Sequence, residues 1–585
     1  MHGAARHLPH MVSENRRSIS GRRTSGQYAA GVRVVGTRAT LLMLALLGCG
    51  GRDATTGVQA PGTISYASSR FTFLVNVLAS TLDPLVVGGI PSRYSVSPAL
   101  PAGLALNAST GRLSGTPTAP SPLATYTVTA LNSAGQASVP LNIDVAPSAA
   151  ITVQVQSSTG VQLGSTFAGF SYEKSQVSKA YFSPANTALL ALYGRLGPGV
   201  LRVGGNSVDK TTWRPTGNGL TAGAVSPADV DRLAAFLRAA DWKVIYAMNF
   251  ADNTPAQMAD EAAYVTRVLG DRLLGLELGN ECDLYRSNGF RPTTYSFNDF
   301  LTEWRAFAAA IQARVPGAVL TGPASAGNTT TYTVPFAKAL GNGIQLLTQH
   351  YYRANGQLAT STMDLLLNPD PGLASTLLTL SRAAKDNGVP GGFRLDEANS
   401  FYNGGAPGIS NGYGTALWAI DFLFANAING VAGVNFHTGG KGPGYTPIAD
   451  DGMNVVDVRP EFYGIYLFAM AAKGTLLATS INGALVPLAA YAVQATDGSM
   501  ALVFVNRDRT TWAQVTVSLP TTTSLATLTE LTGPSLDATT GELLNGAPIN
   551  ADGSWIPSSA RTVAIGGRTL VVLVAPASAM LASVR

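Results

Sequence analysis

Two glutamates in separate segments of the chain could do acid–base chemistry together. LELGNE (276–281) ends at Glu281, and FRLDEANS (393–400) contains Glu397. Hydrolysis of a glycosidic bond needs two such carboxyl groups at one site. One must be protonated to donate to the leaving oxygen, and the other must be ionised to attack or to activate water. Taken singly, each glutamate has the plainer interpretation of a polar residue at a strand end, so the pair carries the hypothesis.

The period-two alternation of a strand predicts which way these acids point. In the first segment it places Glu277, Gly279 and Glu281 on one face, with Glu281 as the last residue of the strand. In the second segment it groups Glu397 with Phe393 and Leu395, and Asp396 should then face away unless a bulge intervenes. We therefore expect Glu281 and Glu397 at the mouth of whatever sheet holds them.

The elements around these segments alternate between strands and helices. Helical patterns occur at 227–240, 256–269, 297–315, 413–428 and 460–473. Eight strand–helix units in about 300 residues predict a (β/α)8 TIM barrel, whose active sites lie at the carboxyl ends of the strands. The predicted strands are 166–173, 200–207, 243–250, 273–281, 318–325, 346–352, 392–400 and 430–439.

Short alternating strands flank the barrel on both sides. Strands spaced by about ten residues predict a small β-sandwich before it, and the run LPAGLALNASTGRLSGTPTAP (100–120) resembles Ig-like or cadherin-like modules of bacteria. A second β-sandwich is predicted after the barrel, with 151–155 as an extra strand. The predicted division of the chain is 1–48 signal peptide, 49–60 linker, 61–147 Ig-like β-sandwich, 148–162 strand joining the C-terminal sandwich, 163–475 catalytic barrel and 476–585 C-terminal β-sandwich.

The first residues predict export. Seven arginines and one acid give residues 1–48 a net charge of +6, so the rest of the chain, with a total of +5, carries −1. The apolar run 39–47 has the length of a signal-peptide core and is too short to span a bilayer. LLGC (46–49) resembles a bacterial lipobox, which implies that Cys49 is acylated; ordinary cleavage nearby is the alternative.

Composition and cysteine count exclude several classes of function. Cys49 and Cys282 are the two cysteines, too few for a disulfide framework or a cysteine-based zinc cluster. We expect no metal and no cofactor, because His350 and His437 are the histidines that follow the leader. The near-neutral charge beyond the leader argues against nucleic acid as a partner. A Cys282–histidine nucleophile is disfavoured, because alternation turns Cys282 away from Glu281, and core packing is the favoured interpretation.

Several motifs together resemble glycoside hydrolase family 79, which contains β-glucuronidases and heparanases. The resemblance covers about residues 150–585, and the Asn-Glu and Asp-Glu-x-Asn-Ser blocks are specific. The motifs are AGFSYEKS (168–175), LRVGGNSVD (201–209), LELGNECDLY (276–285), QHYYR (349–353), FRLDEANSFYNGG (393–405) and NFHTGGKGPGYTPI (435–448).

The resemblance implies roles for individual residues. It makes Glu281 the acid/base and Glu397 the nucleophile of a retaining enzyme, and it places Asn280 at the sugar 2-hydroxyl. A second set is implied for the rest of the sugar, with less specific motifs. Tyr352 would hydrogen-bond the nucleophile; Tyr402, the Gly404 amide and Tyr445 would bind a uronic carboxylate; Glu173 and Asn206, at the first two strand ends, could reach other hydroxyls.

The sequence thus predicts a retaining glycoside hydrolase that cleaves terminal β-linked glucuronic acid, or its 4-O-methyl derivative, from a uronic-acid-containing glycan. A retaining β-glycosidase for a neutral sugar and an endo-acting glycosaminoglycan hydrolase stay open as alternatives. A non-catalytic carbohydrate-binding or adhesion lipoprotein is the alternative of another class. The expected location is the bacterial cell envelope, by a lipid anchor in the membrane, or else the medium, with the Ig-like module available for cell-surface or glycan contacts.

Overall fold

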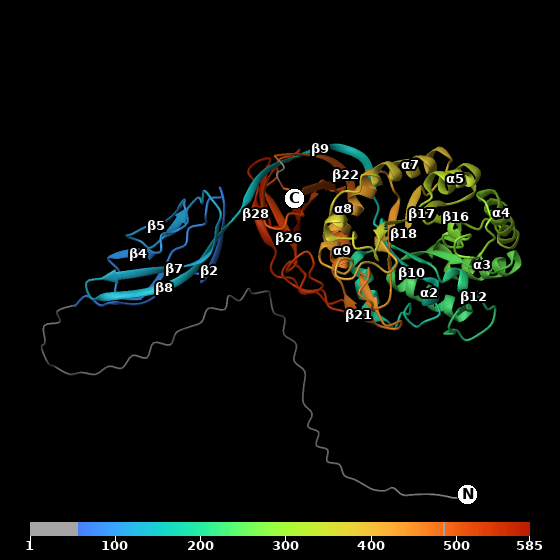
Figure 1. Cartoon of the computed structure of the whole chain (residues 1–585), viewed down its shortest axis with the longest axis horizontal. Helices are drawn as coiled ribbons and strands as arrows, with labels where there is room; N and C mark the ends of the chain where they lie inside the picture. The colour runs from blue at the N-terminus through green and yellow to red at the C-terminus, as the bar shows by residue number, and fades with distance from the viewer. Residues whose placement is uncertain (1–56, 484–485) are drawn as a thin grey trace, which may run out of the picture. The chain divides into compact units, whose positions relative to one another are not determined.

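The computed structural model describes residues 57–483 and 486–585 (Figure 1). Val58–Arg585 form one compact unit by their internal contacts. The predicted signal peptide and Cys49 lie outside the described residues. Along the chain, an all-strand region is followed by alternating strands and helices, and then by strands again.

The first strand-rich region has an Ig-like arrangement. Four strands form one sheet in the order β2-β8-β7-β4, and β1 pairs with β3 while β5 pairs with β6. In β7 the residues Tyr126, Val128 and Ala130 are buried, and the residues between them are more exposed, as expected of a strand with one face on a core. The strands are β1 (Pro61–Ser65), β2 (Arg70–Leu74), β3 (Leu85–Gly88), β4 (Arg93–Ser97), β5 (Leu104–Leu106), β6 (Leu113–Gly115), β7 (Ser121–Asn132) and β8 (Gly135–Ala146).

The central region is a closed barrel of eight parallel strands, which confirms the predicted TIM-type fold. Each strand pairs with the next along the chain, and the last pairs with the first. Parallel strands are buried on both faces, which is why they read as nearly continuous apolar segments. The barrel strands are β10 (Ala168–Glu173), β11 (Val200–Gly204), β14 (Lys243–Met248), β15 (Leu273–Leu278), β16 (Leu320–Ser325), β17 (Leu346–Asn355), β18 (Phe393–Tyr402) and β19 (Gly433–Thr438).

Helices join successive barrel strands and carry apolar side chains toward them. Helix α2 has the predicted bounds, because Ser226 and Asp229 form a capping box around Pro227 at its first turn. Val230, Leu233 and Leu237 of α2 recur at helical spacing and are buried. The helices are α1 (Thr187–Leu196), α2 (Pro227–Ala240), α3 (Pro255–Leu269), α4 (Phe297–Arg314), α5 (Val334–Leu340), α6 (Met363–Leu367), α7 (Leu373–Asp386), α8 (Gly414–Ile428) and α9 (Pro460–Ala471).

The C-terminal strands form one ten-stranded sheet, and β9 lies inside it. As predicted from 151–155, β9 leaves the Ig-like region and pairs with β22 and β25. The strand order is β27-β26-β30-β24-β23-β22-β9-β25-β29, and β28 pairs with β26. The bounds are β9 (Ser148–Leu163), β22 (Gly474–Asn482), β23 (Leu488–Gln494), β24 (Met500–Asn506), β25 (Trp512–Ser518), β26 (Leu525–Thr532), β27 (Leu543–Leu544), β28 (Arg561–Ala564), β29 (Thr569–Val574) and β30 (Ser578–Val584).

Strand β24 connects this sheet to the barrel. Leu502 and Phe504 pack into the core of the C-terminal region, whereas Val503 and Val505 belong to the large core that includes α8 and α9. A strand whose successive side chains enter two different cores ties those cores together. The barrel and the C-terminal region therefore share a buried apolar boundary.

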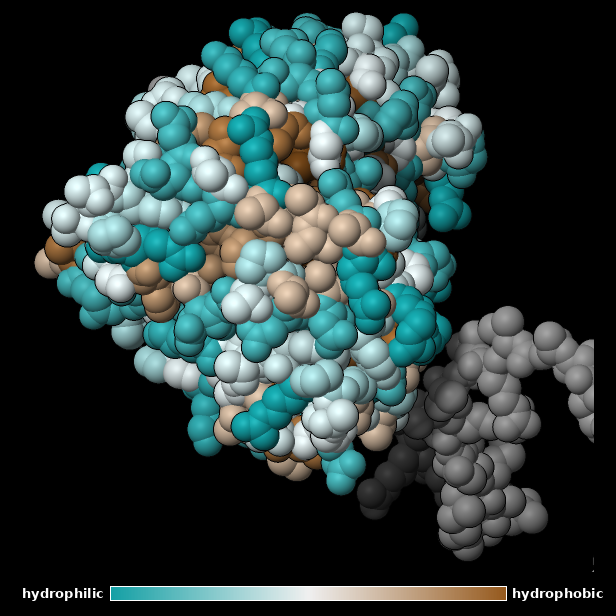
Figure 2. Space-filling model, turned by 90° about the vertical axis from the view of Figure 1, so that its right-hand side faces the viewer, coloured by the Kyte–Doolittle hydropathy of each residue, from teal (hydrophilic) through white to brown (hydrophobic). Residues whose placement is uncertain are grey.

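The surface seen in Figure 2 is mainly hydrophilic, with hydrophobic side chains gathered in smaller areas between polar ones. Single exposed apolar residues are normal on soluble domains and need no special explanation. Among the helices of the described residues, none has both the length and the apolar character needed to cross a membrane.

Candidate active site

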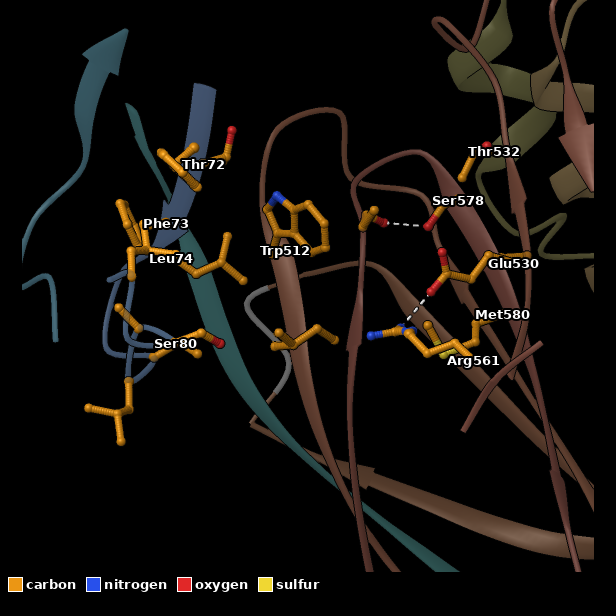
Figure 3. Close-up of a pocket in the computed structure, with 18 residues that line it drawn as sticks. Thr72, Phe73, Leu74, Ser80, Trp512, Glu530, Thr532, Arg561, Ser578 and Met580 are labelled. Carbon is orange, nitrogen blue, oxygen red and sulfur yellow. Dashed lines mark hydrogen bonds and ion pairs between the residues drawn. The ribbon is translucent and has the colours of Figure 1, made fainter. Parts of the chain in front are cut away.

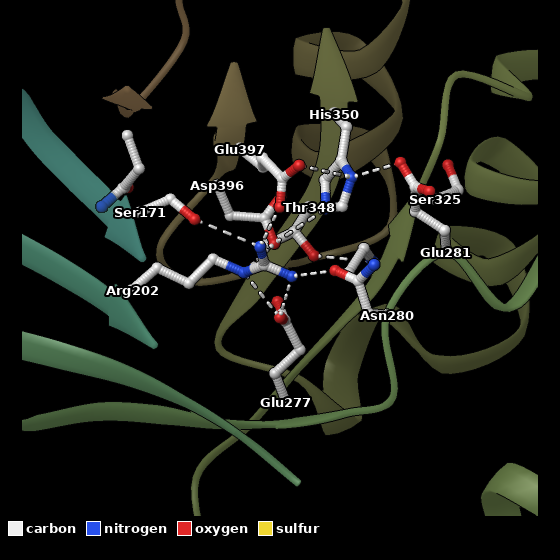
Figure 4. A network of polar contacts seen from close by, with 12 residues as sticks. Ser171, Arg202, Glu277, Asn280, Glu281, Ser325, Thr348, His350, Asp396 and Glu397 are labelled. Carbon is white, nitrogen blue, oxygen red and sulfur yellow. Dashed lines mark hydrogen bonds and ion pairs between the residues drawn. The ribbon is translucent and has the colours of Figure 1, made fainter. Parts of the chain in front are cut away.

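The centre of the barrel mouth is organised by a buried arginine. Arg202, from β11, has no exposed side-chain surface, and it donates from Nε to Glu277 Oε1 at 2.8 Å and from Nη1 to Glu397 Oε2 at 2.6 Å (Figure 4). Its Nη2 donates to Asn280 Oδ1 at 2.9 Å, and Nε lies 3.3 Å from Asp396 Oδ2. One guanidinium thus holds three acids and an amide in fixed positions.

A β-bulge turns two successive acids of β18 into the barrel. Gln349 of β17 pairs with Leu395, and the next residue, His350, pairs with Glu397, so Asp396 is the extra residue. Asp396 and Glu397 therefore both face Arg202. The expectation from strict alternation, that Glu397 shares a face with Leu395, is wrong, because the bulge resets the alternation at this point.

Glu281 lies beyond its strand and not at its last position. Strand β15 ends at Leu278, and Glu281 follows in the left-handed region at φ 50°, with its amide donating to Ala324 O at 2.9 Å. A non-glycine residue there costs about 1–3 kcal/mol and is typical of functional sites. Gly279 makes the turn possible: its φ is 82°, and a Cβ there would come within 2.6 Å of Cys282 Sγ.

The two candidate carboxylates lie close together around one imidazole. His350 Nδ1 is 2.9 Å from Glu281 Oε1 and 4.0 Å from Glu397 Oε1. One ligand atom from each of these three residues lies within 4.8 Å of the others. On the other side of Glu397, His437 Nδ1 is 3.5 Å from Oε2.

The surroundings of Glu397 favour its ionised form. Burial raises the pKa of this carboxyl, but His437, His350 and Arg202 outweigh burial and hold the pKa below its usual value. Tyr352 adds a hydrogen bond from its hydroxyl to Glu397 Oε1 at 2.8 Å. Burial keeps the pKa of Tyr352 well above 10, so the phenol stays protonated and donates.

His350 and Glu277 have unusual protonation equilibria as well. Burial lowers the pKa of His350, but Glu397, the hydrogen bond with Glu281 and Asp396 together raise it to about 9. Burial raises the pKa of Glu277 well above its usual value, with Arg202 opposing. The imidazole is therefore cationic at neutral pH, whereas burial biases the Glu277 carboxyl toward its neutral form against the pull of Arg202.

Four atoms of this cluster make no hydrogen bond within the part of the chain that the structure describes: Glu277 Oε2, His350 Nε2 and both carboxylate oxygens of Asp396. All four are buried. Unsatisfied polar atoms of this kind are costly and gather at functional sites.

The predicted substrate-binding residues differ in how near they come to the pair. Tyr352 contacts Glu397 directly, and its ring centre is 5.6 Å from that of Tyr445 and 6.5 Å from that of Tyr402. Asn280 is linked to the pair by Arg202, which donates a hydrogen bond to the Asn280 side-chain oxygen. The amide nitrogen of Asn280 is then free to donate to another group. These four residues are brought together around the carboxylates.

A cavity of about 410 Å³ opens at the ends of β10 and β19, and its lining includes His437, which lies 3.5 Å from Glu397. Glu173, Gly404, Tyr445 and His437 are among its lining residues, so the structure brings Glu173 together with two of the residues predicted to bind the carboxylate. Asn206 is exposed just after β11 and does not line this cavity. We call this space the β10–β19 pocket.

A second pocket contains no comparable pair of acids among its described lining residues. Figure 3 shows residues of β2 and of the C-terminal strands around a cavity of about 580 Å³. Glu530 is its lining carboxylate, and it is paired with Arg561 at 2.5 Å. The barrel mouth is therefore the candidate active site.

Two other chemistries, metal binding and cysteine nucleophilic attack, have candidate residues near this site. Glu281, His350 and Glu397 are spaced to hold a cation. The Arg202 guanidinium, 2.6 Å from Glu397, already supplies positive charge at that position and disfavours a second cation.

Cys282 is buried, and its thiol lies 3.7 Å from Leu278 O, with its pKa raised well above 9 by burial. It is placed as a packing residue.

Sequence reasoning missed Arg202 and gave no role to His350 and His437. A signal was present: each is a charged or titratable residue inside the predicted buried part of a barrel strand. Such residues are almost never fully buried unless they are paired. Their partners come from other strands, so the pairing itself has no local sequence pattern.

Comparisons with known proteins relate parts of the chain to a domain family and to curated enzymes. The family described as Putative Ig domain matches residues 54–146. Over 220 residues the chain is 31% identical to a beta-glucuronidase of Aspergillus niger, and over 220 residues it is 26% identical to one of Neurospora crassa. These alignments cover 34% and 33% of this chain and span 41% and 39% of the two relatives, well under half of their length.

Solved structures show the same fold. A 4-O-alpha-L-rhamnosyl-beta-D-glucuronidase from Fusarium oxysporum, in complex with Rha-GlcA, matches with a TM-score of 0.62 and 19% identity, over 74% of this chain and all of that one. A family 51 arabinofuranosidase from Xanthomonas axonopodis pv. citri matches with a TM-score of 0.55 and 17% identity, over 75% of this chain and all of that one. At these identities the likeness shows the fold and not the substrate.

Proposed function

We propose that this chain is a retaining glycoside hydrolase acting on β-linked glucuronic acid or a derivative of it. The observation that carries the proposal is the pair Glu281 and Glu397, with carboxylate oxygens within 4.8 Å of each other. Retaining enzymes hold their carboxyl groups about 5–5.5 Å apart, whereas inverting enzymes need about 6.5–9.5 Å to admit a water molecule. The similarity to beta-glucuronidases supports the same class.

In the first step Glu397 attacks the anomeric carbon, while Glu281 gives its proton to the leaving oxygen. The C–O bond to the leaving group breaks, and a glycosyl ester of Glu397 forms. His350 holds Glu281 Oε1, which leaves Oε2 to carry the proton. In the second step Glu281, now ionised, takes a proton from water, whose oxygen attacks the same carbon and releases Glu397.

Residues around the pair are suited to stabilise the charges that develop in these two steps. Arg202 and Tyr352 stabilise the carboxylate of Glu397 before attack and after release. The amide nitrogen of Asn280, oriented by Arg202, can donate to the sugar 2-hydroxyl. Tyr402, Gly404 and Tyr445 supply uncharged donors on the side of the sugar away from Glu281, and a carboxylate accepts several such hydrogen bonds.

The test is a panel of aryl β-glycosides, followed by proton NMR of the first sugar released. We expect a β-glucuronide to be cleaved at least about 10-fold faster than the matching β-glucoside, because donors arranged for an anion are left unpaired by a hydroxymethyl group. The first product should be the β-anomer. An α-anomer would exclude the retaining mechanism, and equal rates would favour a retaining β-glycosidase for a neutral sugar.

Two further outcomes would each identify a different activity. Cleavage inside a glycosaminoglycan chain without release of free glucuronic acid would indicate endo action. Saccharide binding without turnover on any glycoside would indicate a non-catalytic carbohydrate-binding protein.

We also propose that the protein is exported and lipidated at Cys49, which lies outside the described residues. The support is the arginine-rich leader and the apolar run that ends in LLGC. Cys49→Ser should move the protein from the membrane fraction to the soluble fraction. The Ig-like module is proposed as a spacer or adhesion domain between the anchor and the barrel. Unchanged membrane partitioning of Cys49→Ser would exclude the lipid anchor.

A further inference from the structure

The β10–β19 pocket lies on the nucleophile side of the candidate site. His437 lines it and also contacts Glu397 at 3.5 Å, whereas Glu281 is not among its lining residues. In a retaining enzyme the nucleophile meets the glycone, the sugar that becomes esterified, and the acid/base meets the leaving group. A chemical group that enters this pocket therefore belongs to the glycone.

A lysine that no motif assigned is held in the wall of this pocket. Lys179 lines the pocket, and its ammonium donates to Gln176 Oε1 at 2.9 Å. Gln176, 5% exposed, donates in turn from Nε2 to Asp450 Oδ1 at 2.9 Å. The carboxylate of Asp450 also accepts from the amides of Gly452 at 2.8 Å and Gly440 at 2.9 Å.

Lys179 is exposed, and this chain of contacts restrains its side chain, which lowers the entropic cost of ordering it against a ligand. A buried amide and a buried carboxylate, the latter tied to backbone, set the position of an otherwise flexible side chain. Gly452 leaves room for the lysine stem, because a Cβ there would lie 3.1 Å from Lys179 Cδ. An ammonium group can donate three hydrogen bonds, and Gln176 accepts one of them, so two can point to a ligand.

Charge balance makes this lysine decisive for the pocket. Glu173 and Lys179 carry the formal carboxylate and ammonium charges of the lining, so the two cancel. Glu173 already accepts from the Ser207 amide at 2.7 Å, and its Oε1 lies 3.9 Å from His437 Nε2. Without Lys179 the pocket would keep a carboxylate that repels an anionic ligand.

We propose that Lys179, positioned by Gln176 and Asp450, selects an anionic glycone by binding the carboxylate of the terminal sugar in the β10–β19 pocket. It is a specificity-determining residue, additional to the uncharged donors Tyr402, Gly404 and Tyr445. This inference rests on the proposed function for its reaction. Its ligand chemistry, a carboxylate against an ammonium, rests on the pocket alone.

The test compares Lys179→Met with two control variants. Lys179→Met should lower kcat/KM for an aryl β-glucuronide about 10-fold, mainly through KM, because a hydrogen bond to a charged group is lost in a partly open pocket. It should leave the slower aryl β-glucoside reaction unchanged. Lys338→Met, which neutralises a lysine on α5 away from the pocket, should change neither substrate, and Lys179→Arg should recover most of the glucuronide rate.

A binding measurement separates failure of this inference from failure of the proposed function. Titration calorimetry with free glucuronate should show about 10-fold weaker binding to Lys179→Met than to the parent, and the difference should shrink at about 1 M salt, where charges are screened over about 3 Å. If the parent cleaves no glucuronide but this difference appears, the function falls and the anion site stands. Equal glucuronate binding by parent and Lys179→Met, or equal losses on both aryl substrates, would overturn the role of Lys179.

Discussion

The stretch of β18 around Glu397 is more buried and more densely supplied with hydrogen-bond donors than the turn after β15 that carries Glu281. The side chain of Glu397 is 8% exposed and receives hydrogen bonds from Arg202 and Tyr352, whereas that of Glu281 is 18% exposed and meets His350. Two identical side chains a few ångströms apart thus differ in burial and in the number of donors that they meet. In the proposed mechanism this difference in surroundings separates the nucleophile from the acid/base.

The largest expected effect comes from removing the two carboxylates separately. Glu397→Gln should lower turnover of an aryl β-glucuronide by at least about 10⁴-fold, because no other group can form the ester. Glu281→Ala should lose about 10²- to 10⁴-fold on poor leaving groups and keep the first step for good ones. The measurement is kcat on aryl glycosides of graded leaving-group pKa.

Azide distinguishes the two variants. It should accelerate Glu281→Ala with a good leaving group and give a β-glycosyl azide, because a small anion can attack the glycosyl ester where the general base is missing. It should not restore Glu397→Gln as a β-azide. If azide instead rescued Glu397→Gln as a β-azide and not Glu281→Ala, the roles of the two acids would have to be exchanged.

The fold can be predicted from the sequence where local patterns decide it. Helix α2 begins at Pro227 as predicted, because a capping box and an N-terminal proline are encoded within four residues. The barrel follows from strand–helix alternation, and Glu281 and Glu397 stand out as acids near strand ends. In each case the deciding interaction lies within one segment of the chain.

What the sequence does not disclose depends on residues from different segments. The bulge at Asp396 is a matter of register against β17, and no residue type near it demands one. Arg202 meets Glu397, which follows it by 195 residues, only after the barrel closes. The polar wall at Lys179 likewise joins residues 274 positions apart, Gln176 and Asp450. Spacing rules for helices and strands carry no information at that range.

The second prediction concerns pH and the imidazole between the two acids. A folded pKa of about 9 against about 6.5 in the unfolded chain means that protonated His350 stabilises the fold fully below pH 6.5. That contribution, roughly 3 kcal/mol, should be lost as pH rises from about 6.5 to about 9. Urea unfolding at pH 6 and pH 9.5 measures it.

The control for this prediction is His350→Gln, which keeps a neutral hydrogen-bond donor near Glu281. Burial raises the pKa of Glu461 to about 8, so this residue also lowers the free energy of unfolding as the pH rises toward 8. The difference between parent and variant is therefore the informative quantity. The variant should show a flatter dependence between pH 6.5 and 9. If the unfolding free energies of parent and variant depended on pH in the same way, His350 would be neutral in the folded protein and no cation would lie beside Glu281.

The third prediction removes one donor from the β18 side. Tyr352→Phe should lower kcat/KM about 10- to 100-fold, because a hydrogen bond to an ionised group is lost. It should also move the acidic limb of the pH–rate profile upward by about one unit, since the donor that favoured the carboxylate is gone. Tyr351→Phe, on the neighbouring position of β17, is the matched control. A lower rate with an unmoved acidic limb would indicate damaged packing.

The smallest effect is expected next to Glu281, at Cys282. This thiol is 1% exposed, faces the backbone of β15, and stays protonated because burial raises its pKa well above 9. Cys282→Ala should therefore keep kcat within about twofold of the parent and lose about 1 kcal/mol of unfolding free energy, the cost of one small buried group. Iodoacetamide should likewise leave the folded parent active. A loss of turnover as large as that of Glu281→Ala would show that the β15 end depends on the thiol, and the contrast between the two strand ends would need a third reacting group.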